Sequence, residues 1–248
     1  MGGMKNKTNE TAAARPLQRR GRAPKTGNGE RRFEDIVLIA GELFSERGFN
    51  GTSLNDIADA VGVLKGSLYH YISSKEDLLY EVIKVGSEGL AENMRLCDHF
   101  ASSPAEQLIA FCYGHIVLNA VPDRIHRGIV IIQDAKHLAP DKREQIFAER
   151  DAYQAYLRSI ISRGMAANIF DAGIDQRISS FTILGVITSY IRWYKPGGPI
   201  TPHDLARDSA AFVIASLQPQ SPGQDRFALA DRVIAQIQAL QEKAGAAS

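Results

Sequence analysis

Groups that donate hydrogen bonds to anions are concentrated between residues 52 and 75. The candidate contact residues in this stretch are Thr52, Lys65, Gly66, Ser67, Tyr69, His70 and Lys75. Lysine attracts phosphate oxygens as a point charge, and hydroxyl and imidazole groups donate hydrogen bonds to phosphates or to base edges. Glycine lets the backbone come close to a ligand. This set of residue types indicates binding to a phosphate-bearing polymer.

The helices that would position these donors are indicated by capping residues and apolar spacing. Ser53 and Asp56 have the spacing of a capping box, with Asp in place of the usual Glu or Gln, and predict a helix that begins at Ser53. After a turn, a second short helix is expected over residues 65–71. Leu68 and Ile72 are four residues apart, so they would hold this helix against the domain. Two short helices joined in this way form a helix-turn-helix, whose second helix enters the DNA major groove.

Two further helices flank this pair. Apolar residues follow one helical stripe over residues 33–44, and Gly48 is expected to end that helix in a left-handed conformation. Gly62 would end the first helix of the pair. Ser74 is expected to cap a long helix that runs toward Leu96.

The helix-turn-helix geometry divides the candidate residues into two roles. Side chains at the N-terminal end of the second helix reach base edges, so Lys65 and Ser67, on either side of Gly66, are assigned to base reading. The expected phosphate anchors are Thr52, Tyr69, His70 and Lys75. The alternative is a helical hairpin whose tyrosine and histidine only cover a core. The helix caps, the turn and the basic N-terminal segment together favour DNA binding.

Residues 32–80 resemble the N-terminal domain of the TetR family of transcriptional repressors. The matching motif is Phe44-x-x-x-Gly48-Phe49-x-Gly51-Thr52-Ser53-x-x-Asp56-Ile57-Ala58, then Gly62-Val63, then Gly66-Ser67-Leu68-Tyr69-His70-Tyr71, then Ser74-Lys75-Glu76-Asp77-Leu78. Leu64 departs from the family pattern, which often has Ser or Thr there. The recognition helix therefore lacks its usual side-chain cap.

The resemblance implies an all-α fold with a three-helix DNA-binding head at residues 31–78. It also implies a larger helical body for ligand binding and dimerisation at residues 79–217. In such a homodimer, two body helices from each subunit form a four-helix interface. A small-molecule effector in the body changes the spacing of the two heads and releases the double-stranded DNA operator, with repression as the family default.

The N-terminal segment differs in charge from the rest of the chain. Residues 1–32 hold nine basic and two acidic residues, a net charge of +7, whereas the remainder holds 20 basic and 26 acidic residues, a net charge of −6. Residues 1–30 lack apolar periodicity and are expected to form a disordered basic arm. Such an arm contacts DNA phosphates or remains a solvated tail, and its charge agrees with both.

The most distinctive string in the expected body is Arg192-Trp193-Tyr194-Lys195-Pro196-Gly197-Gly198-Pro199. It resembles a segment in the TetR branch that governs steroid and fatty-acid catabolism and senses acyl-CoA thioesters. Arg192 would pair with coenzyme A phosphates and Trp193 would stack on adenine. The alternative is a helix end that docks its aromatic rings into the core. Further candidate ligand residues are Phe111, Gln133, Tyr153 and Tyr156.

Metal binding is an alternative for the body. His115, His126 and His137 recur every 11 residues, and Asp134 precedes His137 by three, a spacing at which an Asp/His pair can share a metal ion. A solvated surface explains these residues equally well, and no metal or other cofactor is expected. Cys97 and Cys112 have apolar neighbours in sequence, so buried structural thiols are expected rather than a redox switch.

Other function classes have less support in the sequence. The chain has no dinucleotide-binding, phosphate-loop, zinc-protease or nucleophile-elbow motif, so it is not expected to be an enzyme. A helical enzyme with scattered catalytic groups remains an alternative, as does a protein-interaction module that uses a final helix at residues 225–243, within the C-terminal segment 218–248. A regulator of efflux that responds to a hydrophobic, drug-like ligand is the alternative to acyl-CoA sensing.

The expected location is cytoplasmic, without membrane contact. Residues 1–32 contain no apolar segment of a secretory signal, and no apolar run approaches the length of about 18–20 residues that a membrane-spanning helix needs.

Overall fold

Helices make up all the regular structure in the residues that the computed structural model describes, namely 29–121, 130, 133–219 and 231–238. The α-helices are α1 (Gly29–Arg47), α2 (Leu54–Val61), α3 (Lys65–Leu68), α4 (Lys75–Asp98), α5 (Pro104–Asn119), α7 (Pro140–Ala166), α8 (Gln176–Thr188) and α9 (Pro202–Leu217). Two 3₁₀ helices, η1 (Ala135–His137) and η2 (Ser189–Arg192), lie between them. This all-helical architecture confirms the expected fold class. The basic arm lies outside the described residues apart from the start of α1.

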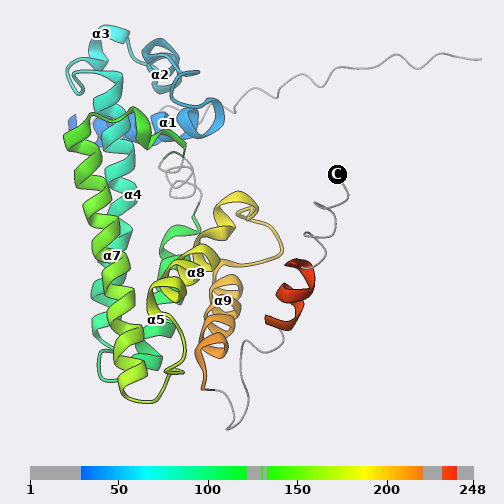
Figure 1. Cartoon of the computed structure of the whole chain (residues 1–248). Coiled ribbons are helices and arrows are strands. Elements are labelled where there is room, and N and C mark those ends of the chain that lie inside the picture. The colour runs from blue at the N-terminus through cyan, green and yellow to red at the C-terminus, as the bar shows by residue number, and fades with distance from the viewer. Residues whose placement is uncertain (1–28, 122–129, 131–132, 220–230, 239–248) are drawn as a thin grey trace, which may run out of the picture.

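The helices form a small head and a larger body (Figure 1). The head, formed by α1 to α3 and the start of α4, lies at one end of the molecule, and α4 and α7 run side by side away from it. At the other end α5 packs between α4 and α9, and α8 contacts α7, α5 and α9. No described helix is long and apolar enough to cross a membrane.

The helix boundaries in the head follow the expected caps. The Ser53 hydroxyl accepts a hydrogen bond from the Asp56 amide at 3.2 Å, and the Asp56 carboxylate accepts one from the Ser53 amide at 2.8 Å. These two bonds satisfy amide groups that the first turn of a helix leaves unpaired. Gly48 and Gly62 both end helices with positive φ angles, 72° and 78°, which glycine adopts without a steric penalty.

The recognition helix α3 is shorter than the sequence predicted. A helix was expected over residues 65–71, but α3 ends at Leu68 and the chain continues in turns, with the Tyr71 amide bonded to the Leu68 carbonyl at 2.9 Å. Leu64 makes no side-chain cap, as expected from its type, and Gly66 disfavours helix within the segment. The short α3 therefore depends on tertiary packing for its position.

The core of the head includes residues from the body. Its members from α1 to α4 include Phe44, Ile57 and Leu68, which are fully buried. The remaining members lie far along the chain and are Val130, Ala135, Leu138 and Ile146. The head is therefore completed by the segment that leads into α7, and its core does not end at the predicted boundary of residue 78.

A second core fills the body between α4, α5, α7, α8 and α9. Cys97 and Cys112 are fully buried in it and unpaired, as expected for structural thiols. Burial raises the pKa of the Cys97 thiol to about 12, so this thiol stays protonated and unreactive at neutral pH. Beyond the body, residues 231–238 are helical, within the range predicted for the final helix, and expose Val233, Ile234 and Ile237.

Candidate nucleic-acid interface

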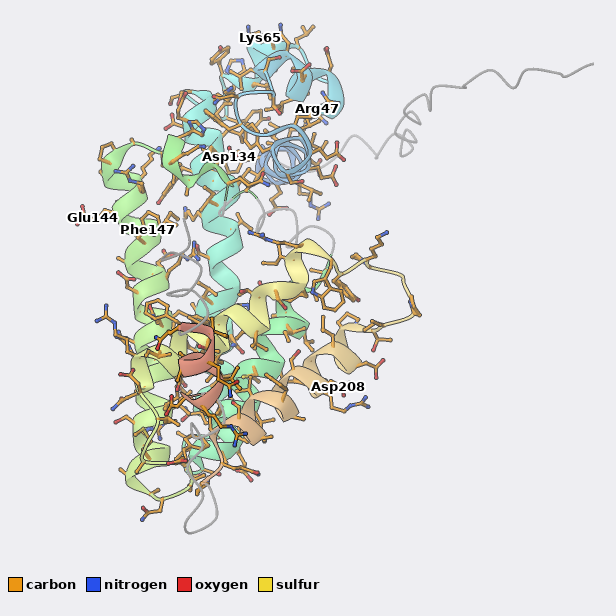
Figure 2. The ribbon with its side chains drawn as sticks, turned by 45° about the vertical axis from the view of Figure 1, so that its right-hand side comes forward. Arg47, Lys65, Asp134, Glu144, Phe147 and Asp208 are labelled. Atoms are coloured by element: carbon orange, nitrogen blue, oxygen red, sulfur yellow. The ribbon has the colours of Figure 1, made fainter. Side chains whose placement is uncertain are left out.

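The outer surface of α3 and the turn after it collects most of the predicted DNA-contacting residues. Lys65, Gly66, Tyr69 and His70 are exposed, and Ser67 is half-buried. Fully buried Leu68 fixes this surface to the head core. In Figure 2, Lys65 lies at the tip of the molecule that is farthest from the body. The surface is therefore open to a large partner that approaches the head from outside.

Gly66 is not required by the packing of the protein. A Cβ atom at this position would meet no atom within 4 Å. Its lack of a side chain keeps the backbone of α3 accessible from outside, which is the condition under which a partner's backbone can approach closely.

Thr52 and Lys75 lie differently from what the sequence suggested. Thr52 is 1% exposed, and its hydroxyl donates to the carbonyls of Gly48 at 3.0 Å and Leu43 at 3.2 Å. The Lys75 ammonium donates to the carbonyls of Phe49 at 2.9 Å and Thr52 at 3.0 Å. Both side chains therefore use their donors to hold the turn between α1 and α2, where the sequence had indicated phosphate anchors.

Three of the predicted ligand residues lie together in the body, with Phe111 and Tyr153 buried and Tyr156 half-buried. The ring of Phe111 on α5 stacks on Tyr153 of α7 with centroids 4.6 Å apart, and the Tyr156 ring lies 6.3 Å from Phe111. The other three lie on the surface: Gln133 just before η1, and Arg192 and Trp193 at the end of η2. The structure thus divides the predicted ligand residues into a buried aromatic group and exposed residues elsewhere.

Polar groups surround the buried aromatic group, among them Asn93, which the sequence analysis did not single out, and His115, which it considered only as a metal ligand. The Asn93 amide nitrogen on α4 donates to the Tyr153 hydroxyl at 2.6 Å and to the Phe111 carbonyl at 2.9 Å. A ring nitrogen of His115 lies 3.0 Å from the same hydroxyl. A single Asn within an amphipathic helix has no sequence signal that separates this role from a surface position, so only the fold reveals it.

The Tyr156 hydroxyl is the centre of a second set of hydrogen bonds, nearer the edge of the body. It donates to the Asp98 carboxylate at 2.6 Å and accepts from the Gln107 amide at 2.9 Å. Arg163 in turn donates to the Gln107 side chain. The Asn93 set and the Tyr156 set of hydrogen bonds both join α4, α5 and α7.

A shallow hollow of about 510 Å³ lies on the α8–α9 side of the body, and none of the predicted ligand residues lines it. It is bordered by Val186, Pro199, Ile200, Asp204, Leu205, Asp208, Ser209 and Phe212. Figure 2 places Asp208 on the outer side of α9. Phe212, which borders the hollow, is 64% accessible, and Ile178 and Phe181 on α8 are also exposed, at 66% and 55%. This is an apolar face rather than an enclosed binding site.

The histidines considered as metal ligands belong to separate regions. His115 is buried in the body, His137 packs on Phe49 of the head, and His126 lies outside the described residues. Within the described part of the chain, no three His, Cys, Asp or Glu residues come together in a metal-binding arrangement. The 11-residue recurrence therefore does not bring His115 and His137 to one site.

Comparisons with known proteins match nearly the whole folded part of the chain. Residues 36–82 match the profile of bacterial regulatory proteins of the tetR family, and residues 101–217 match the tetracyclin repressor-like C-terminal domain. The HTH-type transcriptional repressor KstR2 of Mycolicibacterium smegmatis is 30% identical over 77% of this chain and 93% of its own length.

Solved structures agree with these matches. The ketosteroid transcriptional regulator KstR2 of Mycobacterium tuberculosis is 25% identical, with a TM-score of 0.71 over 78% of this chain and 98% of that one. AibR, solved in complex with isovaleryl coenzyme A and operator DNA, is 26% identical, with a TM-score of 0.63 over 73% of this chain and 97% of that one.

The buried His115 should make stability depend on pH. Burial lowers its pKa from 6.5 to about 4, so the unfolded chain binds a proton in this window that the folded chain does not. Stability contributed by neutral His115 is therefore present above pH 6.5 and is lost as the pH falls toward 4, by at most about 3 kcal/mol. We expect His115→Gln to flatten the fall in melting temperature between pH 7 and pH 5. His99→Gln, at an exposed position, is the control, and an equal slope in both variants would contradict this account.

Proposed function

The chain belongs to the TetR family of bacterial transcriptional regulators, and we propose that it is a homodimeric repressor that an acyl-coenzyme A thioester releases from its operator. Family membership confirms the expectation of a DNA-binding regulator rather than an enzyme. The observation that carries the proposal is the exposed surface of α3, which presents several hydrogen-bond donors at the tip of a head whose core is continuous with the body.

The DNA contacts are assigned to the exposed surface of the head. Lys65 and Ser67 lie at the N-terminal end of α3, from which side chains reach base edges in the major groove. Tyr69 and His70, exposed on the turn that follows, are proposed to donate to phosphates. We give Thr52 and Lys75 a supporting role instead of phosphate contact, because their donor groups bind backbone carbonyls of the head.

Dimerisation is proposed through the apolar face of α8 and α9. Ile178, Phe181 and Gly185 follow one side of α8, and Leu205 and Phe212 lie seven residues apart on α9. A Cβ atom at Gly185 would meet no atom within 4 Å, so a second helix could approach closely there. Exposed apolar patches of this kind mark protein contacts, and a two-fold dimer would present two recognition helices to successive turns of DNA.

An acyl-CoA effector is supported by the relatives and by the chemistry of the body. KstR2 is described as a ketosteroid regulator, and AibR was solved with isovaleryl coenzyme A. In this chain the network around Asn93 and Tyr153 supplies polar groups inside an apolar core, which suits an acyl group with one polar carbonyl. Exposed Arg192 and Trp193 offer a charge for phosphate and a ring for adenine.

Two lysines should separate DNA contact from head stability. Lys65→Ala should weaken binding to a duplex of the gene's own upstream region by about tenfold, as loss of one base or phosphate contact does, with no change in melting temperature. Lys75→Ala should destabilise the protein by about 1–3 kcal/mol, because it leaves two carbonyls without their charged donor. Fluorescence anisotropy and thermal denaturation measure the two effects, and Lys84→Ala on the exposed side of α4 is the control. If Lys75→Ala had wild-type stability but no longer bound DNA, Lys75 would be a phosphate contact and not a structural residue.

The dimer face can be tested with matched phenylalanines. Phe181→Glu combined with Phe212→Glu should convert the protein into a 27.2 kDa monomer in sedimentation velocity, because four buried charges would oppose the interface. Phe147→Glu, which changes a similarly exposed ring on α7, should leave the dimer intact. A double variant that sediments as the wild type does would refute this interface.

Acyl-CoA sensing predicts stabilisation by thioesters but not by coenzyme A alone. Isovaleryl-CoA and longer acyl-CoA thioesters should raise the melting temperature by about 5 °C near saturation, and the best of them should weaken DNA binding. Arg192→Ala should reduce that shift, whereas Arg143→Ala, at an exposed position on α7, should not. Stabilisation only by hydrophobic, drug-like compounds would favour the efflux-regulator alternative instead.

A further inference from the structure

We propose that Asp134 and His137 are positioning residues for DNA binding, which attach the body to the turn between α1 and α2 and so fix the orientation of the recognition helix. We call this pair of residues, with the contacts that they make to Phe49, the bracket. The inference rests on the proposed function, because it concerns how the head is held for operator binding. It adds a polar connection between the body and the α1–α2 turn to the continuous helix α4 and the shared apolar core.

Phe49 makes contacts through its backbone amide, its carbonyl and its ring. Its amide donates to the Asp134 carboxylate at 3.1 Å, and its carbonyl accepts from the Lys75 ammonium at 2.9 Å. Its ring stacks on the His137 ring with centroids 5.0 Å apart and planes inclined by 25°. The Lys75 ammonium lies 4.1 Å from the centroid of the Phe49 ring. Two of these contacts come from a segment more than 80 residues away in the sequence.

The Asp134 carboxylate is almost fully buried, so it needs specific hydrogen-bond partners. Its side chain is 8% exposed, and a buried carboxylate is costly unless hydrogen bonds or an opposite charge compensate for the lost water. The carboxylate accepts a hydrogen bond from the Phe49 amide, and a ring nitrogen of His137 lies 3.8 Å from it. A charged acceptor on a backbone amide is among the stronger hydrogen bonds in proteins. The bracket is therefore an energetically significant contact rather than incidental packing.

The bracket contacts the α1–α2 turn, and the position of this turn determines where α3 lies. Phe49 lies in the turn that leads to Ser53, the cap of α2, four residues later, and α2 leads through a short turn into α3. Helix α4 and apolar packing alone would leave the α1–α2 turn free to shift slightly, whereas the directional contacts to Phe49 fix its position. Figure 2 shows Asp134 beneath the head, between Arg47 and the start of α7. Ala135 and Leu138 anchor the same segment in the head core.

A nearby pair of contacts provides a matched control. Lys142 on α7 lies 2.5 Å from the Asp77 carboxylate, and Gln145 accepts from the Tyr80 hydroxyl at 2.9 Å. These contacts also join body to head, but they reach α4 and leave the α1–α2 turn untouched. Lys142→Ala therefore removes a head–body contact without loosening the bracket.

The test uses the full-length chain and two readouts. Asp134→Ala, Asp134→Asn and Lys142→Ala would be compared by hydrogen exchange of peptides that cover residues 44–53 and by affinity for a duplex of the gene's upstream region. We expect Asp134→Ala to speed exchange in that peptide and to weaken DNA binding, each by about tenfold, as loss of a charged hydrogen bond implies. Asp134→Asn keeps an acceptor oxygen and should recover most of both effects, and Lys142→Ala should change each by less than about twofold.

Each outcome bears on a separate claim. Wild-type exchange and wild-type DNA affinity in Asp134→Ala would overturn the bracket. Faster exchange spread equally over α5 and α9 would also overturn it, because the residue would then support general stability alone. Faster exchange at residues 44–53 with unchanged DNA affinity would leave a contact that does not position the head, and so would refute the inference. A wild-type protein that fails to bind the duplex would instead count against the proposed function.

Discussion

The structure depends on how the turn between α1 and α2 is held. Phe49 and Thr52 in this turn are buried, so their backbone groups need partners within the protein. Thr52 supplies a donor to the end of α1, Lys75 supplies one to Phe49, and Asp134 accepts the Phe49 amide. These side chains come from the turn itself, from α4 and from the body. The recognition helix has one turn and no side-chain cap, so its position comes from this framework rather than from its own helical stability.

The body is organised in a comparable way around one polar side chain. Asn93 is fully buried among apolar residues, and it bonds α5 and α7 at the same time. Gly114 has no side chain because a Cβ atom there would stand 2.1 Å from the Asn93 side-chain oxygen. A network that is fully bonded in an apolar core favours a single arrangement of the surrounding helices. A ligand that offers other polar partners to Asn93 or Tyr153 would change which arrangement is favoured.

The sequence predicted the elements whose cause is local. Caps at Ser53 and Ser74 and left-handed glycines at Gly48 and Gly62 are encoded within a few residues, and the structure has all of them. The length of α3 was overestimated, because apolar spacing alone does not show where a weak helix stops. Burial of Thr52 and the carbonyl contacts of Lys75 depend on residues up to 26 positions away, and a resemblance in motif does not report them. Asp134 was noticed only for its spacing from His137, since its partner Phe49 lies 85 residues earlier.

These contacts relate the two parts of the molecule physically. Lys75 and Asn93 lie on one helix, 18 residues or about 27 Å apart, so α4 carries both the support of the head and the centre of the body network. Because α4 is one continuous helix, a shift of α4 at Asn93 would be transmitted to the head. The head could follow that shift only as far as its second attachment at Phe49 allows. The continuous helix α4 and the side-chain contacts to Phe49 together favour discrete orientations of the head over a continuous range. A ligand-dependent DNA-binding equilibrium requires such discrete orientations.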